Sequence, residues 1–266
     1  MKKLVKKNIL GIDITTSSSN EILEYIDSIL KNSKEKLFIV TPNPEMVVYA
    51  SSNRQYQTTL NRAEIALCDG VGLFIAGRLL GVGVKERISG VDFMKSLCEK
   101  SIKNGLSIGL LGGRDGVAER AAKCLREKYP GLNIVFVAQE WSEEGFARAV
   151  KYQVSSIKYK EERIHNTKHI IRNSNIDMLF VAFGVPKQEE WIMKNLEKLP
   201  VRLAMGVGGA FDYISGDIIR APFFIRSVGL EWLFRLIRQP WRWRRQLALI
   251  TFIGLFIKEY FMYDRK

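Results

Sequence analysis

The chain has 266 residues, of which 47% are hydrophobic and 26% are charged, a composition that excludes a largely disordered protein and allows one large core, with or without an appendage. Its net charge of +13 predicts a polyanionic partner: a nucleic acid, an anionic membrane face or a phosphorylated substrate. Its three cysteines are odd in number and far apart, which excludes a disulfide framework and a cysteine metal site, so we expect a reducing, cytoplasmic location.

The first residues, MKKLVKKNILGID, are charged, and their apolar stretch is interrupted too soon to form the core of a signal peptide. We therefore expect no export signal.

From residue 36 to residue 206, short apolar runs alternate with amphipathic stretches of helical length. We expect strands at 37–41, 64–70, 106–113, 133–139, 177–184 and 202–209. We expect helices at 44–63, 73–81, 91–104, 117–128 and 186–199, the first opened by Pro44. The six strands are nearly all apolar, as strands covered on both faces must be, and this predicts an α/β fold with a Rossmann-like, doubly wound, mainly parallel sheet.

A polar, basic segment at 151–169 interrupts this alternation, and we expect it to be a solvated helix or a loop insertion. Its histidines, His165 and His169, are four residues apart, but no carboxylate or thiol is placed to complete a set of metal ligands. We expect no metal site.

Ligands of open α/β sheets bind beyond the carboxyl ends of the strands. The polar and glycine residues at these expected ends are Thr41, Asn43, Asp69, Gly70, Gly72, Gly112, Gly113, Lys187, Gln188 and Asp212. The glycine-rich stretches lack the GxGxxG dinucleotide pattern, and there is no GxxxxGK[ST] loop. Gly112 and Gly113 precede a helix, where backbone N–H groups could approach a phosphate, although a tight turn explains them equally well.

Asp69 follows the apolar run IALC and precedes Gly70, so we expect a carboxylate at the mouth of the sheet. Partial desolvation there would raise its pKa toward the range of a general base. The alternative is an ordinary helix N-cap. Arg87, Lys187 and Gln188 suit a diphosphate or a hydroxyl group, and each alone could equally be a surface residue.

The tail at 220–266 carries +7 of the net charge and contains the segment LFRLIRQPWRWRRQLALITFIGLF. Leu230, Leu233, Phe234 and Ile237 follow helical spacing and predict one apolar helix face. Arg235, Arg242 and Arg245 are spaced so that they could point one way, toward a phosphate substrate or anionic lipid heads.

The uncharged apolar run at 247–257 is too short to span a bilayer and suits a buried or an interfacial helix. The aromatic residues around it are typical of a membrane-interface belt: Trp241, Trp243, Tyr260 and Tyr263. The alternative is a core helix or an oligomer contact. We divide the chain into an α/β core, 1–219, and a C-terminal appendage, 220–266, that associates with a membrane.

Seven stretches in chain order resemble the motifs of the WecG/TagA/CpsF glycosyltransferases: TPNPEMV, NRAEIALCDGVGL, ERISGVDF, LLGGRDGVAE, FVAFGVPKQEEWI, GVGGAFDYISG and RAPFFIRSVGLEWLFRLIRQPWRWRR. The resemblance implies an inverting bacterial enzyme that moves a sugar from a UDP-sugar to a polyprenyl-diphosphate-linked sugar, in building wall teichoic acid, enterobacterial common antigen or capsule. It is nearest to the TagA-type enzymes, which implies transfer of N-acetylmannosamine to N-acetylglucosamine.

The same resemblance implies roles for individual residues. Asp69 falls on the proposed catalytic base, and Thr41, Arg87 and Gln188 fall on active-site positions. Asp212 and Trp141 match positions that hold the nucleoside, with the Trp141 ring stacking on uracil. Cys68 stands where the family commonly has proline, and the 151–169 insertion lies beside the nucleotide region.

Inversion requires a single in-line displacement, in which Asp69 would take the proton of the acceptor hydroxyl as it attacks the anomeric carbon of the donor. The chain contains no DxD triplet, so we expect arginines and a helix N-terminus, rather than a metal, to neutralise the UDP leaving group. We expect no cofactor. The family likeness favours a cytoplasmic enzyme peripheral on the inner face of the cell membrane, and it leaves open whether the enzyme is a homo-oligomer.

Two other classes of protein compete with this interpretation. A nucleic-acid-binding α/β protein would explain the charge, but no common binding motif is present, and basic residues mixed with tryptophan beside an apolar run suit a bilayer better. A Rossmann oxidoreductase would share the fold and lacks the dinucleotide pattern. We expect neither a nucleic-acid partner nor NAD(P).

Overall fold

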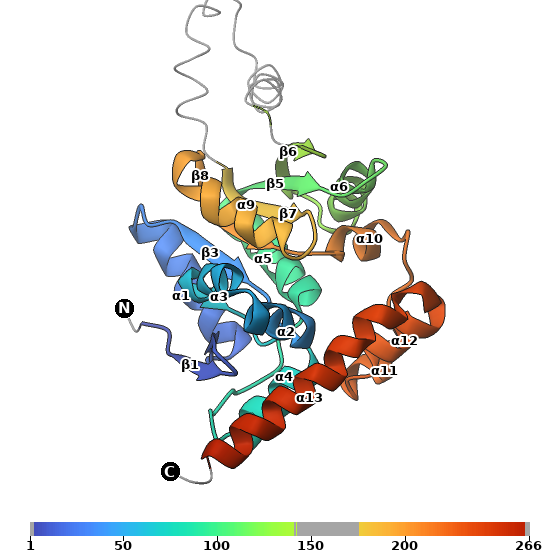
Figure 1. Cartoon of the computed structure of the whole chain (residues 1–266). Helices are drawn as coiled ribbons and strands as arrows, with labels where there is room; N and C mark the ends of the chain where they lie inside the picture. Colours follow the sequence, from blue (N-terminus) through green and yellow to red (C-terminus); the bar gives the residue numbers. More distant parts are fainter. Residues whose placement is uncertain (1–2, 141, 143–175, 264–266) are drawn as a thin grey trace, which may run out of the picture. The chain divides into compact units, whose positions relative to one another are not determined.

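The computed structural model describes residues 3–140, 142 and 176–263 (Figure 1). Trp141 and the 151–169 segment with its two histidines lie outside this description. The chain divides into two compact units. The first unit comprises Met1–Asp27, Ile39–Phe93 and Ile218–Lys266, and the second comprises Ser28–Phe38 and Met94–Asp217.

The six expected strands form one sheet in the order β4-β3-β8-β7-β5-β6. Their bounds are β3 Leu37–Val40, β4 Ile65–Ala66, β5 Ser107–Gly112, β6 Asn133–Ala138, β7 Ile176–Ala182 and β8 Val201–Gly206. The described registers are parallel, and helices flank the strands. Most of the apolar runs read from the sequence are buried, with β3 buried along its whole length, whereas the edge strand β6 is only partly buried. The predicted α/β class with a doubly wound parallel sheet is confirmed.

The first unit begins with a hairpin that was not expected, β1 Lys6–Ile9 paired antiparallel with β2 Ile12–Thr15. Its two turn residues, Leu10 and Gly11, both have positive φ, 52° and 84°. Such turns usually carry Asn-Gly or Asp-Gly, so the usual sequence signal is absent. The Asn8 side chain supplies the missing support, because its Oδ1 accepts a hydrogen bond from the Gly11 N–H at 2.9 Å.

The helix expected at 44–63 is two helices, α2 Pro44–Ser52 and α3 Arg54–Arg62, so that prediction is wrong in this detail. Asn53 separates them with an extended backbone, and its side chain accepts a hydrogen bond from the Tyr56 N–H at 2.9 Å. Asn competes with a continuing helix through such local bonds, and here it ends one helix and caps the next. The helices that follow are α4 Val71–Leu79 and α5 Gly90–Asn104.

In the second unit, α6 Val117–Lys128 packs against β5 and β6, and α9 Lys187–Asn195 packs against β7 and β8. A short 3-10 turn, η2 Leu196–Lys198, follows α9, and α10 Ala210–Ser215 lies beside α6. The helix α1 Ser19–Asn32, which precedes β3, was not expected either.

The C-terminal helices belong to the first unit. They are α11 Phe223–Ser227, α12 Glu231–Arg238, η3 Pro240–Arg242 and α13 Trp243–Tyr263. The expected helix before Pro240 and the disturbance at Pro240 are both present. Figure 1 shows α13 running along α2, and the two helices are in contact.

Phe252 fixes the middle of α13 to the body of the first unit. It is 4% exposed. A Cβ added to Gly72, at the start of α4, would lie 3.6 Å from the Phe252 ring and 3.1 Å from Pro44. In the part of the chain that the structure describes, no helix has the length and apolarity needed to cross a membrane.

Candidate active site

The carboxyl ends of β3 and β4 bring Thr41 and Asp69 together in the first unit. The two strands are in parallel register, with Val40 opposite Ala66. Beyond the strands the Leu67 N–H donates to the Val40 carbonyl at 2.9 Å, and the Asp69 N–H donates to the Pro42 carbonyl at 3.0 Å. The backbone around the Asp69 carboxylate is therefore held at the edge where an open α/β sheet binds its ligands.

Two backbone N–H groups converge on the Asp69 carboxylate. The Gly70 N–H donates to Oδ1 at 2.7 Å, and the Gly90 N–H donates to Oδ2 at 3.3 Å. Gly70, with φ of 82°, is the N-cap of α4 and makes no side-chain cap bond. Asp69 is therefore not the N-cap of this helix, and the ordinary capping role weighed for it does not apply.

Burial raises the pKa of Asp69 to about 6. The hydrogen bonds from Gly90 and Gly70 oppose this rise, as does the positive charge of Arg87, while the negative charge of Glu231 adds to it. The carboxyl is thus ionised at neutral pH while being more basic than an ordinary aspartate, which suits a group that must accept a proton.

Thr41 and Gly90 pack closely in front of this carboxylate. Thr41 is 8% exposed. A Cβ added to Gly90 would lie 3.0 Å from the Thr41 methyl group, tight enough that the threonine would have to shift by a few tenths of an ångström. Only glycine therefore leaves the threonine and the donating N–H in their present places.

Arg87 is held by the chain's C-terminal part. Its Nη2 donates to the backbone carbonyl of Arg226 at 2.7 Å, and its charge lowers the pKa of Asp69. Asn43 also lies in the first unit, where its Oδ1 accepts from the Met46 N–H at 3.0 Å and caps α2. Its amide oxygen is therefore already engaged in capping α2.

The remaining predicted residues on strand ends lie in the second unit. The register sets Gly112 opposite Ala182, and the Gly113 N–H donates to the Ala182 carbonyl at 3.1 Å. Gly112 has a φ of 104°, and a Cβ there would lie 2.8 Å from the Ala182 backbone. The glycines therefore allow a sharp turn and a close approach of two strand ends.

Gln188 is 1% exposed and lies in the first turn of α9. Its amide NH₂ donates to Glu189 Oε1 at 2.6 Å, and its amide oxygen accepts from the Gly208 N–H at 3.0 Å. The side chain thus braces the loop after β8. Lys187 is exposed at the start of the same helix, and Asp212 is partly buried in the first turn of α10.

The three arginines predicted on the tail lie on successive elements of the first unit: Arg235 on α12, Arg242 in η3 and Arg245 in the first turn of α13. Arg245 pairs with Glu45, from Nη2 at 2.7 Å and from Nε at 3.0 Å. Glu45 lies in the first turn of α2, so this pair attaches the start of α13 close to Asn43.

Four charged residues near this centre were not found by sequence reasoning: Asp92, Arg220, Arg226 and Glu231. They form a connected set of ion pairs. Asp92 and Arg220 are 128 residues apart, and no periodicity or motif spacing links them. Only the folded chain joins them. Among the described residues, no group of three His, Cys, Asp or Glu side chains is arranged as a metal site.

Known proteins resemble this chain over most of its length. A model of the glycosyl transferase WecG/TagA/CpsF family matches residues 7–266. A protein of Bacillus spizizenii named N-acetylglucosaminyldiphosphoundecaprenol N-acetyl-beta-D-mannosaminyltransferase is 30% identical over 252 residues, which is 95% of this chain and 91% of that protein. A protein of the same name from Staphylococcus aureus (strain MRSA252) is 31% identical, over 87% of this chain and 84% of its own.

Proposed function

The chain belongs to the WecG/TagA/CpsF family of glycosyltransferases, and from this membership we propose that it transfers N-acetylmannosamine from a UDP-sugar to polyprenyl-diphosphate-linked N-acetylglucosamine. The names of its relatives support this choice of sugar and acceptor. The proposed product is an early lipid-linked intermediate of teichoic acid or of a related cell-wall polymer.

The observation that carries the mechanism is the Asp69 carboxylate, which is partly buried and held by two N–H groups at the carboxyl ends of β3 and β4. We assign it as the general base. It takes the proton of the acceptor hydroxyl while the hydroxyl oxygen forms a bond to the anomeric carbon, and the bond from that carbon to UDP breaks on the opposite side. One displacement inverts the configuration, and UDP leaves with the bonding electrons.

The other predicted residues receive supporting roles in this proposal. Thr41 and Arg87 lie around Asp69 and would orient the acceptor and the donor. The turn at Gly112 and Gly113 would let a phosphate come close to the backbone, although the Gly113 N–H itself is already bonded to the Ala182 carbonyl. Lys187 would contact the diphosphate or a sugar hydroxyl, and Asp212 and Trp141 would hold the nucleoside. Gln188, which is buried with its amide already bonded to Glu189 and Gly208, would act by holding the loop after β8 in place.

Neutralising the UDP leaving group is assigned to arginine side chains rather than to a metal. The arginines assigned are Arg235, Arg242 and Arg245, whose guanidinium groups match phosphate oxygens in geometry. Arg245, which pairs with Glu45, would exchange that carboxylate for a phosphate. Transfer should then persist in excess EDTA.

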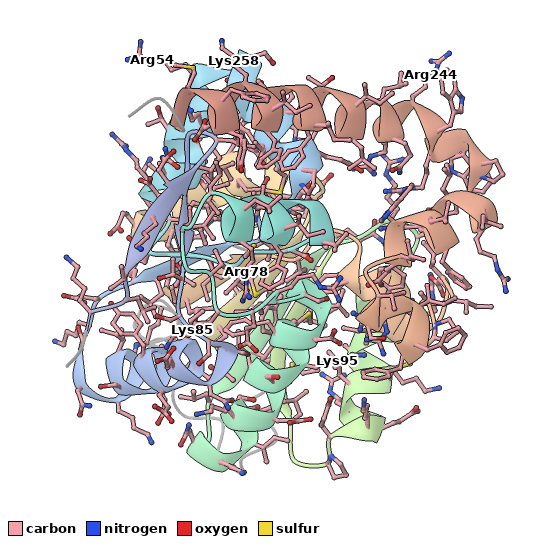
Figure 2. The ribbon with its side chains drawn as sticks, turned by 90° about the horizontal axis from the view of Figure 1, so that it is seen from below. Arg54, Arg78, Lys85, Lys95, Arg244 and Lys258 are labelled. Carbon is pink, nitrogen blue, oxygen red and sulfur yellow. The ribbon has the colours of Figure 1, made fainter. Side chains whose placement is uncertain are left out.

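The C-terminal helices are the proposed membrane contact. Their large apolar side chains are widely exposed, among them Phe223, Phe224, Ile237, Trp241 and Ile250. An exposed apolar surface of this kind marks an interaction site rather than an ordinary surface. Figure 2 shows Arg244 and Lys258 near opposite ends of α13, both pointing outward, and Arg54 of α3 points the same way in this view. Cationic side chains around an apolar helix suit an anionic leaflet, which here would be the inner face of the cell membrane.

The test is transfer of labelled sugar from a panel of UDP-sugars, including UDP-N-acetylmannosamine, to a polyprenyl-diphosphate N-acetylglucosamine analogue in detergent or vesicles. Wild-type protein should transfer N-acetylmannosamine, and Asp69→Asn should bind UDP but turn over far more slowly. Transfer of a different sugar would correct the donor alone. No transfer from any UDP-sugar by folded protein would overturn the proposed reaction.

A further inference from the structure

Arg220, in the C-terminal part of the first unit, binds residues at the start of α5 and just before it. Arg220 binds Asp92 through both terminal nitrogens, from Nη1 to Oδ1 at 2.5 Å and from Nη2 to Oδ2 at 2.8 Å. Its Nη2 also donates to Ser89 Oγ at 3.0 Å, and its Nε donates to Glu231 Oε1 at 3.0 Å. The Arg220 side chain is 13% exposed. A bidentate, largely buried guanidinium of this kind fixes geometry far better than an exposed ion pair does.

The residues that Arg220 holds flank the backbone that faces Asp69. Ser89 and Asp92 lie on either side of Gly90, whose N–H donates to Asp69 Oδ2. The same segment is bonded to the Asp69 loop through its neighbour, because the Ile88 N–H donates to the Cys68 carbonyl at 2.9 Å. A shift of the segment 88–92 would therefore move the N–H group that the carboxylate accepts from.

Arg87 depends on the same cluster. Its guanidinium donates to the backbone carbonyl of Arg226, at the end of α11. The Arg226 side chain donates to the Ala221 carbonyl at 3.0 Å and pairs with Asp92 at 3.4 Å. Asp92 is thus shared by two arginines, and the carbonyl that orients Arg87 belongs to one of them.

We propose that Arg220 is a positioning residue for the Asp69 centre: through Asp92, Ser89 and Glu231 it holds the Gly90 N–H and the Arg87 guanidinium in place against the Asp69 carboxylate. This inference rests on the proposed function in taking Asp69 as the general base. Arg220 itself touches neither Asp69 nor, in this proposal, the substrate. It acts through the segment 87–92 and through the start of α12.

Removing Arg220 should change the environment of Asp69 so that the pKa of its carboxyl rises. The groups that act on this carboxyl are the Gly70 and Gly90 N–H groups, Arg87 from the loop before α5, and Glu231 from α12; the Cys68 thiol is adjacent. Without Arg220 the Gly90 N–H and Arg87, which favour the ionised form, are held less firmly. Glu231 also loses the cation that balances it. Both changes raise the pKa of Asp69.

The experiment compares wild type, Arg220→Met and Arg220→Lys in the full chain. A matched control is Arg202→Met, because Arg202 is also a partly buried arginine that pairs with an aspartate, Asp177, and donates to two backbone carbonyls. In Arg220→Met we expect kcat to fall about tenfold to a hundredfold, the size of effect that a remote misplacement of catalytic groups produces. The KM for the UDP-sugar should stay within about twofold of wild type.

The pH dependence separates positioning from a general loss of structure. The acidic limb of the plot of kcat against pH should shift to higher pH by about half a unit or more in Arg220→Met. Arg220→Lys, which keeps the charge without the bidentate fork, should give an intermediate kcat and an intermediate limb. Arg202→Met should lower the melting temperature and leave both the limb and kcat as in wild type.

An unchanged limb with an unchanged kcat in Arg220→Met would overturn the inference, as would equal changes in Arg202→Met. Should Arg220→Met fail to fold, Asp92→Asn is judged by the same criteria. A second readout is independent of transfer: ¹³C titration of aspartate carboxyls, with Asp69 assigned from Asp69→Asn. An Asp69 pKa that is not raised in the variant overturns the inference even if transfer is observed. If wild type transfers no sugar, the proposed function fails, and this titration still decides the inference.

Discussion

At the scale of single residues, opposing influences set the state of the Asp69 carboxyl. Burial and the charge of Glu231 favour the protonated form, while the Gly70 and Gly90 N–H groups and Arg87 favour the ionised form. Burial is the largest influence, and the pKa rises from its ordinary value of 3.8 to about 6. A base near this value is ionised at neutral pH and still holds a proton well enough to draw it from a hydroxyl.

Replacing Asp69 by Asn removes the base and leaves an isosteric side chain. We expect kcat to fall by about 10²–10⁴, the usual contribution of a positioned proton acceptor. The affinity for UDP should change little, because binding of the UDP moiety does not require the negative charge that the substitution removes. Kinetics and calorimetry would measure both quantities. Asp13→Asn, in the β1–β2 hairpin, is the matched control. Turnover by Asp69→Asn equal to that of the control would remove Asp69 as the base.

The pH dependence of the wild-type enzyme follows from the same carboxyl. Only the ionised form accepts a proton, so kcat should be half-maximal near pH 6, fall at lower pH and level off at higher pH. Arg87→Met removes a charge that lowers this pKa, so its acidic limb should move to higher pH. A rate profile measured between pH 5 and 8, with protein stability checked at each point, tests this. A limb that moves downward in Arg87→Met would contradict the assignment.

The polar residues at the strand ends could be predicted from the sequence because their positions depend only on the residues next to them in the chain. An apolar run followed by Asp-Gly places a carboxylate at the mouth of a sheet, and the structure brings Thr41, Asn43, Asp69 and Arg87 into one unit. The sequence could not show that Asn43 Oδ1 is taken by the Met46 N–H. Nor could it show that Arg220 meets Asp92, because that pairing exists only after distant segments have folded together.

At the scale of elements, the sheet was predictable because buried parallel strands need apolar side chains on both faces, a strong and local constraint. The helix α6 has the bounds expected from its periodicity. The break at Asn53 and the hairpin turn at Leu10 and Gly11 were missed for a common reason. Each depends on one asparagine side chain that bonds to the backbone and stabilises its conformation. The surrounding sequence gives no sign of that conformation.

The 3-10 turn η2, which follows α9, is held by a lysine from the segment before β3. Lys36 Nζ donates to the carbonyls of Leu196, Glu197 and Leu199, at 2.7, 2.9 and 2.7 Å. A cation at the end of a helical segment gives a hydrogen-bond donor to carbonyls that have few or no partners within the segment. We expect Lys36→Met to destabilise the protein by about 1–3 kcal/mol.

Urea unfolding would measure this loss, and sugar transfer should be unaffected at temperatures where the variant is folded. Lys34→Met, an exposed lysine two residues earlier, provides the control. Equal stability of the two variants would mean that the three bonds contribute nothing net.

The exposed apolar side chains of α13 allow a test of whether this helix contacts the membrane. Ile250 and Ile257 are exposed, at 69% and 48%, while Phe252 holds the helix in place. Glutamate at both exposed positions should leave the fold intact and reduce sedimentation with anionic vesicles, because burying charge in the interface is costly and the lipid heads are negative. Val5→Glu, a similarly exposed apolar residue in the N-terminal part, should bind as wild type does. Equal sedimentation of all three proteins would exclude α13 from the membrane contact.

At the scale of the whole molecule, the excess positive charge is concentrated in the C-terminal part. The net charge is +13, and residues 220–266 contribute +7 of it. These residues also belong to the first unit, since Phe252 packs on Gly72 and Arg220 holds Asp92. Deleting them would therefore disturb the Asp69 centre as well as any membrane contact. Tests of membrane binding need the full chain.

Salt provides such a test without altering the protein. Attraction between a basic surface and an anionic leaflet is screened over about 10 Å at 0.1 M salt and about 3 Å at 1 M. Binding to vesicles of phosphatidylglycerol and phosphatidylcholine should therefore weaken as salt rises, by about tenfold or more between 0.05 and 0.5 M. A weaker, salt-insensitive component should remain, because exposed apolar side chains enter the interface regardless of charge. Pure phosphatidylcholine vesicles should show this second component alone. Equal binding to both vesicle types at low salt would mean that the charge has no part in membrane contact. Duplex DNA binding of the same strength and salt dependence would instead assign the basic surface to polyanions in general.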